Sequence, residues 1–111
     1  MRLGFVLAAA FGLCAVTVSA YAADVPTYQQ IKQIISERCT TCHSEEIRTH
    51  GIYDAPAGIK YDTAEEIRVY AKGIMRVATQ TKTMPPPETT EMTDAERDMI
   101  AAWYAAGAKV P

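Results

Sequence analysis

The stretch Cys39-Thr40-Thr41-Cys42-His43 decides how the rest of the sequence is interpreted. It has the pattern Cys-x-x-Cys-His, which is typical of covalent haem attachment. Two thiols three positions apart, at the end of a helix, can reach the two vinyl groups of one porphyrin and form thioethers. His43 follows directly and can project its imidazole under the iron. The pattern therefore predicts one covalently attached haem c, held by Cys39 and Cys42, with His43 as an iron ligand.

Three other chemistries are open to the same residues. A thioredoxin-like redox pair is typical of chains with a βαβ unit, and no run of this sequence alternates with the period of a strand. A disulfide between Cys39 and Cys42 would close too short a loop to add much stability. Zinc could bind Cys39, Cys42, His43 and His50, but the direct adjacency of Cys42 and His43 makes a tetrahedral site awkward to close. Haem attachment is the interpretation that the spacing favours.

The beginning of the chain is typical of an export signal. Met1 and Arg2 give a positive start, residues 3–20 are apolar and uncharged, and Ala20-Tyr21-Ala22 matches an Ala-x-Ala cleavage pattern. We therefore expect a signal peptide over residues 1–22, cleaved near Ala22. A retained membrane anchor is the alternative, because the apolar run is nearly long enough to span a bilayer.

The remaining residues, 23–111, are expected to form a single haem domain. Haem is attached to Cys-x-x-Cys-His motifs outside the cytoplasm, so the motif and the export signal support each other and predict a periplasmic protein. Cys14 lies within the predicted signal and would leave with it, so that only Cys39 and Cys42 remain in the mature chain.

Length and composition are those of one small globular domain. The chain has 111 residues, 49% of them hydrophobic and 22% charged, which argues against a disordered chain. Its 13 acidic and 11 basic side chains give a formal charge of −2, so no basic field is available to hold nucleic acid or an anionic membrane. A domain of this size buries a modest share of its surface and is expected to need a bound group for firm stability.

Three segments have apolar residues at helical spacing, each preceded by a threonine that can cap a helix. Thr27 with Gln30, and Thr93 with Glu96, form capping boxes. No run alternates with period two, so we predict an all-α fold of three main helices. The predicted helices run from Tyr28 to about Arg38, from Asp62-Thr63 to about Thr79, and from Thr93 to Gly107.

The iron also needs a ligand opposite His43, or an open position there. Methionines of the mature chain are candidates: Met75, Met84, Met92 and Met99. Two of these fall within predicted helices, where methionine usually packs in the core. Met84 instead lies in a connection and precedes three prolines, residues 85–87, which fix the backbone and remove competing N–H donors. We predict Met84 as the second ligand, with Met92 and His50 as alternatives.

With these features in order, the chain resembles the class I monohaem c-type cytochromes from about Tyr28 to Gly107. The resemblance implies a small cytochrome c-like domain, with three main helices wrapped around one covalently attached haem. The resemblance implies that the carbonyl of Pro56 accepts a hydrogen bond from the His43 imidazole, which would orient the ring. It also implies that the first and last helices cross near the haem through four side chains: Ile31, Ile35, Ile100 and Trp103.

A closer resemblance links the chain to the haem-bearing tail domain of membrane-anchored bacterial urate hydroxylases. It is carried by Ala55-Pro56-Ala57-Gly58-Ile59, by Asp62-Thr63-Ala64-Glu65-Glu66-Ile67 and by Met92-Thr93-Asp94-Ala95-Glu96-Arg97. That tail usually has Gly-Asn after Met-Pro-x, where this chain has Pro87-Glu88. A role in purine oxidation would be an analogy drawn from this resemblance alone.

Ligation by His43 and Met84 would leave the iron no open position for oxygen or substrate, which predicts an electron carrier and not an enzyme. The expected partners are redox proteins, such as a dehydrogenase, an oxidase or a membrane complex, which it would contact transiently. We expect a monomer with no stable membrane insertion after signal cleavage. The candidate pocket walls are Tyr28, Ile31, Tyr61, Ile67, Tyr70, Ile74 and Trp103.

Two other functions remain as alternatives. A haem-based sensor or small-ligand-binding protein would have a labile Met84 or none on the iron. A peroxidase-like enzyme would need polar groups at an open distal site, and only His50 is available for that role.

Overall fold

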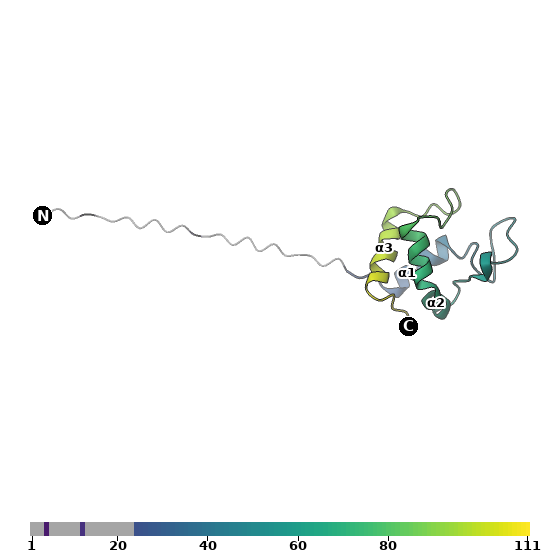
Figure 1. Cartoon of the computed structure of the whole chain (residues 1–111), viewed down its shortest axis with the longest axis horizontal. Coiled ribbons are helices and arrows are strands. Elements are labelled where there is room, and N and C mark those ends of the chain that lie inside the picture. The colour runs from purple at the N-terminus through teal and green to yellow at the C-terminus, as the bar shows by residue number, and fades with distance from the viewer. Residues whose placement is uncertain (1–3, 5–11, 13–23) are drawn as a thin grey trace.

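The computed structural model describes Gly4, Gly12 and residues 24–111, so that most of the predicted signal peptide lies outside the described residues. The described part contains helices and no strand, as Figure 1 shows, and the prediction of an all-α fold is confirmed. No helix in it has the length and apolarity needed to span a bilayer. The three main helices are α1 (Tyr28–Arg38), α2 (Ala64–Met75) and α3 (Asp94–Ala105).

The ends of these helices follow from local capping chemistry. Thr27 and Thr93 form complete capping boxes, in which the hydroxyl accepts from the backbone three residues later and the side chain there accepts from the threonine N–H. Thr63 caps α2 through a hydrogen bond from the Glu66 N–H, at 3.1 Å. Gly107, just beyond α3, has φ of 107°, a conformation that residues with a side chain rarely adopt.

The second helix differs from its prediction in the last turn. A single helix was expected to about Thr79, whereas α2 ends at Met75 and continues as the wider turn η2 (Arg76–Gln80). There the N–H of Thr81 bonds to the Arg76 carbonyl five residues back, at 2.9 Å. Apolar spacing alone cannot signal such a widened turn, which is frequent at functional sites.

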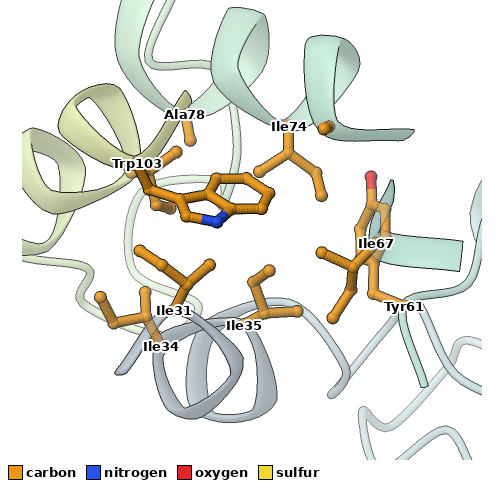
Figure 2. Close-up of a cluster of buried hydrophobic side chains, with 10 residues drawn as sticks. Ile31, Ile34, Ile35, Tyr61, Ile67, Ile74, Ala78 and Trp103 are labelled. Carbon is orange, nitrogen blue, oxygen red and sulfur yellow. The ribbon is translucent and has the colours of Figure 1, made fainter. Parts of the chain in front are cut away.

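One core joins the three helices around Trp103, as Figure 2 shows. Trp103 is 2% exposed and its indole N–H donates to the Lys109 carbonyl at 3.0 Å, so the buried nitrogen is satisfied. Helix α3 contacts both α1 and α2. Side chains predicted to join the first and last helices lie together in this core: Ile31, Ile35, Ile100 and Trp103.

Candidate functional site

A cavity with a volume of about 110 Å³ opens beside the C-terminal end of α1. Apolar residues that sequence reasoning did not single out contribute to its walls: Ile52, Val77, Ala78 and Pro85. The cavity also brings together every residue predicted for the site: Cys39, Cys42, His43, Pro56 and Met84.

The predicted wall residues divide into two groups. Tyr61 and Ile74 line the cavity. The others belong to the helix–helix core or pack against it, because a buried position at helical spacing can face a neighbouring helix as well as a cofactor. Five of the candidate wall residues do not line the cavity: Tyr28, Ile31, Ile67, Tyr70 and Trp103.

The end of α1 places the two cysteines. Cys39 is the C-terminal cap, and its carbonyl accepts hydrogen bonds from the N–H groups of Cys42 (3.2 Å) and His43 (2.9 Å). This tight turn directs Cys39, Cys42 and His43 to one cavity, and both thiols are free. Burial raises the pKa of the Cys39 thiol to about 12. A thioredoxin-type pair depends on a lowered thiol pKa, so the site does not favour dithiol redox chemistry.

The imidazole of His43 is held in a defined orientation. Its Nδ1 lies 2.8 Å from the carbonyl oxygen of Ile59. A carbonyl only accepts, so Nδ1–H is the donor and the lone pair of Nε2 is free to bind a metal. The His43 carbonyl accepts from the Tyr61 N–H at 3.0 Å, and the two rings lie 5.1 Å apart between centroids.

The predicted partner of this histidine was wrong. The Pro56 carbonyl does not accept from His43 but from the N–H of Ile59, at 3.1 Å, within the short turn η1 (Pro56–Gly58). Within this turn the Pro56 carbonyl is bonded to the backbone N–H of Ile59. Ile59 follows the turn in an extended conformation, and its own carbonyl faces the His43 imidazole. Pro56 keeps a place in the cavity wall.

Asp62 fastens the residues that follow His43, a role that the sequence did not indicate. Its carboxylate accepts from the Ser44 hydroxyl at 2.6 Å and from the Glu45 N–H at 2.9 Å. The hydrogen bond from Ser44, aided by that from Glu45, holds the pKa of Asp62 below its ordinary value. Residues 59–62 thus clamp the backbone on which His43 is carried.

A hydroxyl contacts the second cysteine. Thr49 Oγ1 lies 3.2 Å from Cys42 Sγ and donates to the Thr41 carbonyl at 2.9 Å. The single hydroxyl proton of Thr49 is used in the hydrogen bond to this carbonyl. The Cys42 thiol is therefore the donor to the Thr49 oxygen. This contact closes the loop after the motif against the motif itself.

Met84 lies at the edge of the cavity with its side chain 39% exposed. Its N–H donates to the Val77 carbonyl at 3.1 Å, and its own carbonyl accepts from Arg97 Nη1 at 2.9 Å. The next residue, Pro85, is buried. The backbone of Met84 is thus fixed on both sides of its α-carbon, and its role as iron ligand stays a prediction.

The alternative metal ligands are not gathered at the cavity. His50 is exposed and does not line it. In the described part of the chain, no three or more His, Cys, Asp or Glu side chains come together as a metal site. The zinc interpretation therefore has no preformed site among these residues.

The donor set at the cavity fits a covalently attached haem: two free thiols, an imidazole with a free Nε2 and a thioether, among apolar walls. The family model described as Cytochrome c matches residues 28–105, a segment that contains the residues lining the cavity and the whole of α1, α2 and α3. No match was found among curated proteins or among solved structures.

Proposed function

Since the chain belongs to the cytochrome c family, whose domain carries covalently bound haem c and transfers electrons, we propose that it is a periplasmic monohaem electron carrier. In this proposal Cys39 and Cys42 hold the haem through thioethers, and the two protein ligands of the iron are His43 and Met84. When bound, the haem supplies a one-electron ferrous–ferric couple.

The observation that supports this proposal most is the single cavity shared by the two thiols, the imidazole and the thioether. Ile59 contributes by fixing the proton on Nδ1 of His43, which leaves Nε2 as the donor atom. Tyr61, Ile74 and Val77 contribute to the mostly apolar walls of the same cavity. An apolar surrounding and a thioether ligand both favour the lower charge of the ferrous form, so we expect a raised reduction potential.

The proposed setting of the protein follows from its beginning and its surface. The signal-like residues 1–22 support export to the periplasm. Cytochromes c are generally electron carriers and not enzymes, so the proposed partners are redox proteins, such as a dehydrogenase, an oxidase or a membrane complex. The formal charge of −2 offers no basic field to hold nucleic acid, so none is proposed as a partner. The protein is proposed to act as a monomer.

The ligand assignment is tested by Met84→Leu, with Met92→Leu as the matched control because Met92 does not line the cavity. Holoprotein with a methionine ligand has a weak near-infrared absorption band. We expect Met84→Leu to lose this band and to have a lower midpoint potential, because a thioether ligand is removed from the iron. Loss of the band in Met92→Leu, with the band retained in Met84→Leu, would assign the ligand to Met92.

A haem-based sensor or small-ligand binder is the second candidate, and the exposure of Met84 is the observation that favours it. The two functions differ in how the wild-type iron responds to added carbon monoxide. A carrier is expected to bind carbon monoxide only after Met84→Leu, whereas a sensor is expected to bind it in the wild type.

A further inference from the structure

We propose that Arg97 is a positioning residue for Met84, which it holds at the cavity while keeping one positive charge beside the site. The proposal rests on the proposed function, because it takes Met84 as the iron ligand. Arg97 lies in the first turn of α3, and no pattern of the sequence predicted this role for it.

One guanidinium nitrogen joins three parts of the chain. Arg97 Nη1 donates to the Ala78 carbonyl in η2, at 2.7 Å, and to the Met84 carbonyl, at 2.9 Å. Val77, the neighbour of Ala78, accepts the N–H of Met84 at 3.1 Å. The widened turn η2 and α3 together therefore fix the backbone from which the Met84 side chain extends.

Few other hydrogen bonds hold residues 84–89, the methionine segment. The prolines at 85–87 have no N–H to donate, and the backbone bond from Thr89 to Pro86, at 3.3 Å, lies within the segment itself. The next attachment to the rest of the domain is at Thr90, which bonds to Arg38. Without Arg97, the backbone of Met84 itself would keep only its bond to Val77.

The guanidinium of Arg97 donates to the carbonyl oxygens of two residues that line the cavity, Ala78 and Met84. None of the four ion pairs among residues 24–111 includes Arg97. Burial raises the pKa of the Cys39 thiol, and the charge of Arg97 opposes this rise, which places the charge within electrostatic reach of the cavity wall. A fixed positive charge near the iron disfavours the more positive oxidised state and so raises the potential.

The test compares holoproteins of the wild type, Arg97→Gln and Arg97→Lys. Arg76→Gln is the matched control, because Arg76 is exposed on η2 and its side chain makes no hydrogen bond within residues 24–111. Three properties are measured: the near-infrared methionine band, the midpoint potential, and the affinity of the ferric protein for imidazole, which competes with Met84.

We expect Arg97→Gln to bind imidazole about tenfold more tightly than the wild type, the factor that loss of one charge-assisted hydrogen bond would give. Its midpoint potential is expected to be lower than that of Arg76→Gln. Arg97→Lys, which keeps the charge and a donor, is expected to recover most of the potential. These shifts together would support a positioning role.

Two results would overturn the proposal. If Arg97→Gln and Arg76→Gln have the same imidazole affinity and potential, Arg97 does not act on the ligand, even if Arg97→Gln unfolds more easily. If the wild-type holoprotein has no methionine band, the ligand assignment itself fails and this proposal falls with it. Should Arg97→Gln not fold, Arg97→Lys decides: a midpoint potential far below that of Arg76→Gln, although the charge and a donor are kept, would contradict the proposal.

Discussion

Three contacts from one short segment set the position of His43. The carbonyl of Ile59 accepts a hydrogen bond from Nδ1–H of His43. The backbone N–H of Tyr61 donates to the His43 carbonyl, and the Tyr61 ring lies beside the imidazole. Asp62 then fastens Ser44 and Glu45, the residues that follow. These contacts would keep the imidazole in one orientation when the charge at the site changes, as the proposed role of His43 as an iron ligand requires.

Asp62→Asn tests the clamp through the pH dependence of stability. The folded-state pKa of Asp62 is lowered, so its contribution is present above its ordinary value of 3.8 and is lost as the pH falls from there through the lowered folded pKa. We expect Asp62→Asn to be less stable than the wild type at pH 6 and to approach it below pH 3. Urea unfolding at both pH values measures this difference.

Asp54→Asn is the matched control, since Asp54 is exposed and its carboxylate makes no hydrogen bond in the described part of the chain. This variant is expected to follow the wild type at both pH values. A constant difference between Asp62→Asn and the wild type across the pH range would contradict the role given to the Asp62 charge.

At the level of single residues, the predicted donor residues line one cavity, whereas the contact predicted to orient His43 is wrong. Cys39, Cys42 and His43 are adjacent in the chain, and their chemistry can be read from spacing. The partner of His43 depends on where a carbonyl points, and the turn η1, with Ala57 at φ of 57°, directs the Pro56 carbonyl away. No side-chain pattern encodes such a direction.

Among the elements, the junction of α1 and α3 depends on one carboxylate with two tasks. Glu96 accepts from the N–H of Thr93 at 2.8 Å, completing the capping box of α3. It also pairs with Arg38, the last residue of α1, through both carboxylate oxygens. Burial opposes ionisation, but the bonds from Arg38 and Thr93 outweigh it and leave the pKa of Glu96 below its usual value.

Glu96→Gln is expected to destabilise the fold by about 1–2 kcal/mol, because it removes a half-buried ion pair but leaves an oxygen for the Thr93 N–H. Chemical unfolding at pH 7 measures this loss. Glu65→Gln is the control, since the pair of Glu65 with Arg68 is exposed, and it should change stability by less than about 0.5 kcal/mol. Equal losses in the two variants would contradict the special role of the α1–α3 junction.

Helix positions could be predicted well because their signals are local. The capping boxes at Thr27 and Thr93 place the starts of α1 and α3, and Gly107 marks the end of α3. The end of α2 could not be predicted from local signals. The widened turn η2 is hydrogen-bonded to Met84 and to Arg97, which lie further along the chain. Tertiary contacts of this kind leave no period in the sequence.

For the molecule as a whole, Trp103 connects all three helices through one core. Trp103→Ala is expected to cost about 3–5 kcal/mol, as large-to-small changes in a core do. Trp103→Phe should cost less than Trp103→Ala, because phenylalanine keeps most of the side-chain volume. It still loses the hydrogen bond to the Lys109 carbonyl. Urea unfolding, followed by both circular dichroism and haem absorption, measures the loss.

Tyr53→Ala is the control for this change, since Tyr53 is 87% exposed and should be replaceable with little effect. A near-wild-type stability of Trp103→Ala would show that the core is not organised around the indole. Unfolding transitions that differ between the two probes would contradict a single cooperative domain.

At this scale the family and the all-α architecture could be predicted from the order of motifs along the chain, and the Cytochrome c model matches residues 28–105. The resemblance to the tail domain of urate hydroxylases stays a prediction. The division of apolar residues between the core and the cavity wall could not be predicted, because Ile67 and Ile74 share one face of α2 and only Ile74 reaches the cavity.

The most direct test of the account is mass spectrometry of the exported protein, made in cells with the haem-attachment machinery and digested to the peptide that contains Cys39 and Cys42. We predict that this peptide carries one haem joined to both sulfurs, and that a Cys39→Ala, Cys42→Ala double variant carries none. A wild-type peptide with two unmodified cysteines, or with a bound zinc ion in place of haem, would contradict the account.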